Sequence, residues 1–170
     1  YQIHWPDSRV PIGETMQAME NLVDQKIVRY IGVSNFSTSE LQRAQAAMAN
    51  HSIVSNQVLY SLKERQIERD LLPYCEANHV TVIAYTPLAD GSLAAKPRFG
   101  PQRGFEALES VAAQVNKTPA QVALNWCTAH HNVIAIPKSN SLSRTEENCG
   151  ASGWRLSQQQ VRDLAQAFDS

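Results

Sequence analysis

Two kinds of segment alternate along the chain. Short runs rich in β-branched residues are followed by longer stretches in which apolar residues recur every three or four positions. The short runs are typical of strands covered on both faces, and the longer stretches are typical of amphipathic helices. The alternation therefore predicts successive βα units around a parallel sheet. The expected strands span Tyr1–Trp5, Ile27–Val33, Ser52–Asn56, Val80–Ala84 and Asn132–Ile136.

Helix starts are marked by a hydroxyl residue followed three positions later by glutamate or glutamine. In this capping box the hydroxyl and the acidic or amide side chain satisfy backbone donors that the first turn leaves free. The expected boxes are Ser37 with Glu40, Thr118 with Gln121, Ser143 with Glu146 and Ser157 with Gln160. Apolar residues at helical spacing predict core-facing stripes at Met16, Met19, Leu22 and Val23, and at Leu108, Val111, Ala112 and Val115.

The least regular stretch, Asp90–Gly104, lies between a predicted strand and a predicted helix. It concentrates glycine and proline with three basic residues, Lys96, Arg98 and Arg103. Such a composition predicts a mobile loop on the side where the strands end.

Five βα units are fewer than the eight that close a barrel. An open sheet of five apolar strands would leave long edges and an uncovered face, which favours aggregation. We therefore expect an α/β chain of the (β/α)8 TIM-barrel type in which residues 1–170 form one domain and a partial barrel.

Composition narrows the classes of partner. Lysine plus arginine (15) nearly balance aspartate plus glutamate (16), so nothing indicates nucleic acid or an anionic membrane. The three cysteines, Cys75, Cys127 and Cys149, lack the spacing of a zinc or redox pair and are expected to be free thiols. No apolar stretch approaches the roughly 20 residues that span a bilayer, so we expect a cytoplasmic protein without a metal site.

Six short motifs lie where expected strands end or expected helices begin. They are Ile3-His4-Trp5-Pro6, Gly32-Val33-Ser34-Asn35-Phe36, Asn56-Gln57, Ala84-Tyr85-Thr86-Pro87-Leu88, Ile136-Pro137-Lys138-Ser139 and Arg144-Thr145-Glu146-Glu147-Asn148. Together, and in this order, they resemble the aldo-keto reductase family over the whole chain, from that family's fourth barrel strand to its end. Active sites of such barrels are built at the carboxyl ends of the strands.

The resemblance implies NADP(H) as cofactor, held across the barrel mouth without a glycine-rich dinucleotide fold. Ser34, Asn35 and Gln57 would hold the nicotinamide carboxamide, which needs both donors and acceptors. Tyr85 would stack on the ring, and the same motif adds Thr86 and Leu88 to the expected cofactor contacts. Two alternatives stay open: Tyr85 as a packed aromatic at a strand end, and Asn35 as a turn residue before the Ser37 cap.

Lys138, Ser139 and Arg144 predict an anion site on physical grounds, since two cations and a hydroxyl meet the start of a helix expected at Ser143. The alternative is a solvated basic helix end. The resemblance makes the anion the adenosine 2′-phosphate, with Glu147 and Asn148 facing the adenine. Because NAD(H) would leave both cations unpaired, we expect a preference for NADP(H).

His4 is the candidate catalytic residue, and a hydrogen-bonded core histidine is its alternative. By resemblance it would orient a carbonyl substrate, but the family's aspartate, tyrosine and lysine lie on earlier strands. Without the tyrosine's proton transfer, worth roughly 10²–10⁴-fold, we expect the chain to be inactive alone. Whether it is an enzyme thus stays open: the function implied is reduction of aldehydes or ketones, and the alternatives are a non-catalytic NADP-binding or interaction module, a half-barrel completed by an amino-terminal partner, or self-association.

Overall fold

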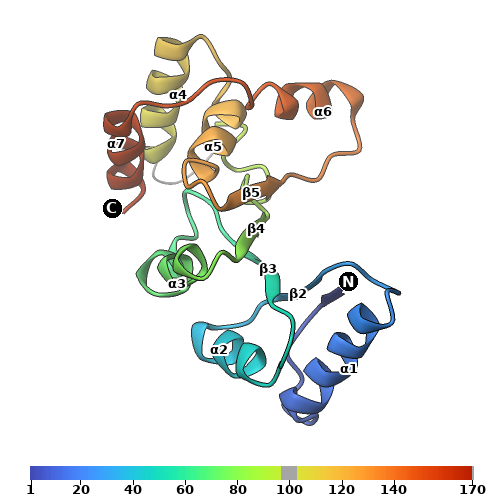
Figure 1. Ribbon diagram of the computed structural model, residues 1–170. Coiled ribbons are helices and arrows are strands. Elements are labelled where there is room, and N and C mark those ends of the chain that lie inside the picture. The colour runs from blue at the N-terminus through green and yellow to red at the C-terminus, as the bar shows by residue number, and fades with distance from the viewer. Residues whose placement is uncertain (97–102, 170) are drawn as a thin grey trace. The chain divides into compact units, whose positions relative to one another are not determined.

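The computed structural model describes residues 1–96 and 103–169 (Figure 1). By its internal contacts the chain divides into two compact units. Unit 1 comprises Tyr1–Val58 and Ile67–Ile83, and unit 2 comprises Leu59–Gln66 and Ala84–Ser170.

Five strands form one sheet in the order in which they occur along the chain, which confirms the predicted partial (β/α) architecture. β1 pairs with β2, and β2 with β3, in parallel. Their bounds are β1 Gln2–Ile3, β2 Ile31–Ser34, β3 Ile53–Leu59, β4 Thr81–Tyr85 and β5 Val133–Ile136. The expectation that every strand is covered on both faces is wrong for β1, where Gln2 is exposed and Ile3 is half-buried, and for β5, where Ile134 and Ile136 are exposed and only Val133 is buried.

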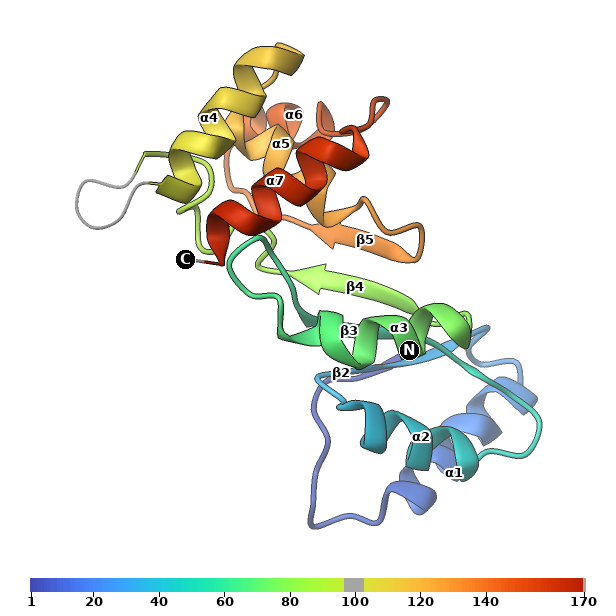
Figure 2. The same ribbon diagram turned by 90° about the vertical axis from the view of Figure 1, so that its left-hand side faces the viewer.

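Helices follow the strands as the apolar spacing predicts. Figures 1 and 2 show α4 and α7 side by side in unit 2, where a Cβ added at Gly104 would press on the ring of Phe168. The helices are α1 Ile12–Asp24, α2 Thr38–Ala46, α3 Leu71–Ala77, α4 Arg103–Val115, α5 Pro119–Cys127, α6 Leu142–Cys149 and α7 Gln158–Phe168, with a 3-10 turn, η1, at Gln66–Arg69.

Three of the four predicted capping boxes are present, at Ser37, Thr118 and Ser157. The box expected at Ser143 is wrong. The N-cap of α6 is Ser141, two residues earlier, and no side-chain cap hydrogen bond is recorded among the described residues. The reason is local: the Ser139 hydroxyl accepts from the Ser141 amide and donates to the Ser141 carbonyl, which fixes the start of the helix upstream.

The irregular segment before α4 is shorter than predicted. α4 begins at Arg103, so Arg103 and Gly104 are helical rather than part of a loop. The chain from Ala89 to Ala94 forms successive hydrogen-bonded turns. Arg98 and the rest of residues 97–102 lie outside the described residues.

The end of α1 explains why the second strand starts later than the sequence suggests. Lys26 adopts a left-handed conformation with φ 60°, its amide donates to Val23, and the Ile27 amide donates to Leu22. These are the two bonds of a Schellman motif, in which glycine usually occupies the left-handed position. The motif uses the first residues of the segment Ile27–Val33 that we expected to be strand, so β2 begins only at Ile31.

A glycine at this helix end is expected to stabilise the protein. Because a residue with a Cβ is strained at positive φ, Lys26→Gly should raise the free energy of unfolding by about 0.5–1 kcal/mol. Asn116 ends α4 with the same pair of bonds at φ 53° and is the matched control. Asparagine tolerates this conformation, so Asn116→Gly should gain less in urea denaturation. Equal gains at both positions would contradict this explanation.

The pairing of β2 with β3 contains an irregularity that sets the register of the strand ends. Ile31 pairs with Ile53 but Val33 pairs with Asn56, so β3 carries one extra residue opposite Gly32. A Cβ at Gly32 would collide with the Ser55 hydroxyl. The absence of a side chain at Gly32 therefore accommodates the bulge, after which Gln57 pairs with Ser34.

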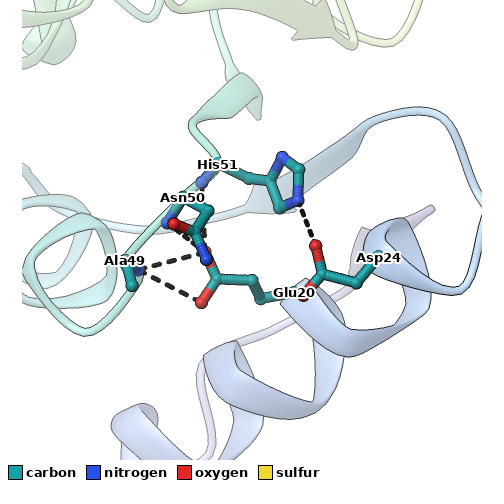
Figure 3. Close-up of polar contacts among 5 residues, drawn as sticks. All are labelled: Glu20, Asp24, Ala49, Asn50 and His51. Carbon is teal, nitrogen blue, oxygen red and sulfur yellow. Dashed lines mark hydrogen bonds and ion pairs between the residues drawn. The ribbon is translucent and has the colours of Figure 1, made fainter.

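Glu20 of α1 fixes the segment that leads into β3 (Figure 3). Its buried carboxylate accepts hydrogen bonds from the backbone amides of Ala49, Asn50 and His51 at 2.7–3.1 Å. These hydrogen bonds hold the pKa of Glu20 below its usual range. The bond from the Asn50 amide has the largest effect, and the bond from the Ala49 amide has the next largest. Beside it the His51 ring lies 2.7 Å from the Asp24 carboxylate.

Stability should therefore depend on the ionisation of Glu20. A carboxylate whose folded pKa is lowered contributes stability above its ordinary pKa and loses that contribution as the pH falls through the folded value. Glu20→Gln should lower the urea midpoint at pH 7, and the difference from wild type should shrink between about pH 5 and pH 3.

Glu14→Gln is the matched control for Glu20→Gln, because the same change falls on an exposed carboxylate of the same helix. It should leave the urea midpoint nearly unchanged. A Glu20→Gln deficit that does not vary with pH would contradict the role of the charge.

The three cysteines are free, as predicted. Cys75 and Cys127 are buried, and burial raises the pKa of each thiol to about 12. Cys149, at the end of α6, is exposed. Among the described residues, no helix has the length and apolarity to cross a membrane.

Candidate functional site

At the carboxyl ends of β1, β2 and β3 unit 1 gathers four predicted site residues: His4, Ser34, Asn35 and Gln57. His4 follows β1, Ser34 ends β2 with Asn35 next in the chain, and Gln57 is the register partner of Ser34 on β3. We call these four the strand-end group.

Hydrogen bonds connect the strand-end group internally. The Gln57 carbonyl oxygen accepts from the Ser34 hydroxyl and from the Asn35 amide, both at 2.8 Å. The Asn35 side-chain nitrogen lies 3.1 Å from the Ser34 hydroxyl and 3.4 Å from the His4 carbonyl oxygen. Ser34 is buried, and its hydroxyl both donates to the Gln57 carbonyl and accepts from the Asn35 side chain, so these bonds hold the strand-end group together.

The backbone around Asn35 explains this arrangement. Asn35 has φ 61°, a conformation that asparagine adopts more readily than most residues. Behind it Asn56 is fully buried, and its side-chain nitrogen donates to the Phe36 carbonyl at 2.9 Å. The two residues of the Asn56-Gln57 motif therefore have different roles. Asn56 stabilises the turn at Asn35 and Phe36, and Gln57 belongs to the strand-end group.

His4 is exposed, unlike the buried core histidine considered as its alternative. The next residue, Trp5, is 60% exposed, and its ring is stacked with that of His4 at a centroid distance of 6.4 Å. Trp5 lies in the motif Ile3-His4-Trp5-Pro6 but was not predicted as a site residue, because its exposure becomes visible only in the structure.

In unit 2 a second group of predicted residues lines a single pocket of about 500 Å³, which we call the α6 pocket. Six predicted site residues contribute to it, from the turn after β4, the end of β5 and α6. The predicted residues are Leu88, Lys138, Ser139, Arg144, Glu147 and Asn148. The structure adds Asp90, Gly91, Ala94, Ala95, Ala120 and Pro137, none of which was predicted as a site residue.

Charges of both signs line the α6 pocket. Lys138 and Arg144 are exposed, and the structure records no ion pair for either within the described residues. Asp90 and Glu147 line the same pocket. The first amides of α6 have no partner inside the helix and add partial positive charge at its start. The pocket therefore offers an anion two cations, one of them in the first turn of α6, and it also contains two carboxylates that would repel an anion.

Tyr85 ends β4 and Thr86 follows it. Both are half-buried, but neither is among the described residues that line the α6 pocket. The Tyr85 carbonyl accepts from the Tyr60 amide at 3.5 Å, and Thr86 has φ 51°. Their predicted contacts with a nicotinamide ring stay predictions. The described residues contain no cluster of three or more histidine, cysteine or acidic side chains suited to a metal ion.

The model of the aldo/keto reductase family matches residues 1–169, nearly the whole sequence. The chain belongs to the aldo/keto reductase family. Among curated members, it is 37% identical to an uncharacterized oxidoreductase of Mycobacterium tuberculosis, with 99% of this chain and 59% of that protein covered. It is 34% identical to the methylglyoxal reductase YeaE of Escherichia coli, with 99% of this chain and 57% of that protein covered.

Solved structures of aldo-keto reductases match the fold as well. A thermostable member crystallised with the inhibitor epalrestat aligns with a TM-score of 0.89 at 36% identity, covering 98% of this chain and 58% of that one. A Klebsiella pneumoniae member in complex with NADP and acetate aligns with a TM-score of 0.85 at 35% identity, covering 99% and 58%. This aldo/keto reductase chain thus spans a little under three fifths of the relatives it matches.

Proposed function

We propose that this chain provides the NADP(H)-binding part of an aldo-keto reductase that reduces aldehydes or ketones. The observation that carries the proposal is that Lys138, Ser139 and Arg144, the last of which lies in the first turn of α6, line one pocket. Two cations beside a helix amino terminus fit a phosphate. Support comes from the Klebsiella pneumoniae family members crystallised with NADP and with NADPH.

Within this proposal each group has a separate task. In unit 2, Lys138, Arg144 and the Ser139 segment hold the 2′-phosphate, and Glu147 and Asn148 face the adenine. In unit 1, Ser34, Asn35 and Gln57 hold the carboxamide, and His4 donates a hydrogen bond to the substrate carbonyl. Tyr85, with Thr86 and Leu88, contributes to cofactor contacts. When bound, NADPH supplies the hydride.

We also propose that residues 1–170 act as one domain that corresponds to the carboxy-terminal part of the family's barrel, from its fourth strand onward. The order of the six motifs and the coverage of 57–59% of the curated relatives support this assignment. The tyrosine, lysine and aspartate of the family's tetrad have no counterpart in these motifs. The chain alone should therefore bind cofactor with little or no carbonyl reduction.

Fluorescence titration of the purified chain with NADPH and with NADH tests the proposal. We expect saturable binding of NADPH and weaker binding of NADH, because NADH leaves both cations without a phosphate. No saturable binding of NADPH, or equal binding of both cofactors, would remove the NADP(H) assignment. Turnover of a carbonyl substrate by the chain alone would leave the cofactor site intact but contradict catalytic incompleteness.

A further inference from the structure

One wall of the α6 pocket is the turn Leu88–Ala95, which contributes five of the lining residues. Three consecutive residues in this turn have positive φ: Ala89 at 47°, Asp90 at 54° and Gly91 at 87°. Glycine adopts this conformation freely, and aspartate tolerates it. Ala89 has neither property, so contacts from outside its own backbone must stabilise the turn.

The Ser92 hydroxyl supplies the first of these contacts. It donates a hydrogen bond of 2.7 Å to the carbonyl oxygen of Ala89, the strained residue. The same hydroxyl accepts a hydrogen bond of 2.8 Å from the ammonium group of Lys63. A cationic donor polarises a hydroxyl and strengthens the bond that this hydroxyl donates. Lys63, Ser92 and Ala89 therefore form a chain that ends on the turn.

Lys63 follows a buried segment of the same unit. Tyr60, Ser61 and Leu62 are at most 1% exposed. The Ser61 hydroxyl accepts from the backbone amides of Lys63 and Glu64, both at 3.2 Å. The backbone of Lys63 is thus fixed, although its side chain is exposed and does not line the α6 pocket among the described residues.

We propose that Lys63 is a positioning residue for the cofactor pocket, which through Ser92 holds the left-handed turn Ala89–Gly91 in the conformation that forms the pocket wall. The proposal rests on the proposed NADP(H) function of this pocket. Lys138 and Arg144 lie outside the turn, so loss of Lys63 should weaken both cofactors alike and leave the preference for NADPH unchanged. No motif of the sequence pointed to Lys63 or Ser92.

A double-mutant cycle of Lys63→Met and Ser92→Ala tests this role by NADPH and NADH titration. Each single variant should bind NADPH about 3- to 10-fold more weakly, and the double variant should be no weaker than the weaker single variant. Lys63→Arg, which retains a cationic donor, should restore most of the affinity. Lys26→Met, at an exposed lysine of unit 1, should bind as wild type does.

Hydrogen exchange of the free protein gives a readout that does not depend on the cofactor. The amides of Gly91, Ser92, Leu93 and Ala94, all bonded within the turn, should exchange faster in Lys63→Met and in Ser92→Ala, with the urea midpoint almost unchanged.

Three results would overturn the role of Lys63: unchanged NADPH affinity in Lys63→Met, additive losses in the double variant, or a changed NADPH preference. If wild type binds NADPH and Lys63→Met binds equally well, only this inference fails. If wild type shows no NADPH binding, the proposed function fails and takes this inference with it.

Discussion

Replacing both Lys138 and Arg144 by alanine is expected to weaken NADPH binding by about 100-fold while changing NADH binding little. A hydrogen bond to a charged group contributes about 1.5–3 kcal/mol, and solvent screening at these exposed side chains reduces that value. A combined loss of about 2–3 kcal/mol corresponds to roughly 30- to 150-fold in affinity. NADH lacks the 2′-phosphate, so removing the same cations should change its affinity little.

The matched control for this pair removes one lysine and one arginine elsewhere. Lys26→Gly with Arg29→Ala lowers the charge of the chain by the same amount, and neither residue lines the α6 pocket. Its NADPH affinity should equal that of wild type when titrated by fluorescence at constant ionic strength. If the Lys138→Ala, Arg144→Ala double variant lost NADPH and NADH affinity equally, the two cations would attract anionic ligands in general and would not bind the 2′-phosphate specifically.

Gly32→Ala is expected to lower the free energy of unfolding by about 2 kcal/mol, in the range of overpacked cores. The added Cβ would collide with the Ser55 hydroxyl and lie 3.1 Å from the Ser55 carbonyl oxygen and from Cγ of Gln2. That hydroxyl accepts a hydrogen bond from the Gln2 side chain at 2.9 Å, so it cannot move without losing this partner.

The same change should disturb the strand-end group. The extra residue of β3 lies opposite Gly32, and it brings Gln57 rather than Asn56 beside Ser34. A shift of one residue would turn the side chains of this strand to the other face. The amide of Asn35, which donates to the Gln57 carbonyl, should therefore exchange faster in Gly32→Ala.

Urea denaturation of two further variants distinguishes the steric collision at Gly32 from the general effect of replacing glycine by alanine on the backbone. Ser55→Ala in the Gly32→Ala background removes the nearest colliding atom and should restore part of the lost stability. Gly13→Ala places the same methyl group in α1, 3.9 Å from the Ala47 Cβ, and should stabilise the helix by about 0.5–1 kcal/mol. If Gly32→Ala were no less stable than wild type, the close packing at the bulge would not determine the register.

Features encoded within a few residues were predicted well from the sequence. The boxes at Ser37, Thr118 and Ser157 are each complete within four residues, and all three are present. The box at Ser143 failed because three serines, Ser139, Ser141 and Ser143, compete within a short segment, and Ser139 determines the turn before the helix can start there. A local sequence pattern predicts a helix start reliably only where no neighbouring side chain can form an alternative hydrogen bond to the same backbone.

The candidate site divides in the same way. Lys138, Ser139 and Arg144 lie close in the sequence and line one pocket, whereas Asp90 and Ala120 reach that pocket from other segments and were not predicted to contribute to it. The bulge opposite Gly32 depends on packing between strands. A glycine inside an apolar run was the one available hint of it, and it did not specify the register.

Because Cys149 alone of the three cysteines is exposed, it is a natural attachment point for a reporter group. Cys75 and Cys127 are shielded inside the protein and scarcely ionise near neutral pH, whereas Cys149 is exposed directly after Asn148, which lines the α6 pocket. A thiol-reactive fluorophore would thus label the unaltered sequence at one position beside the pocket. Occupancy of the pocket then becomes observable in solution without any engineered residue.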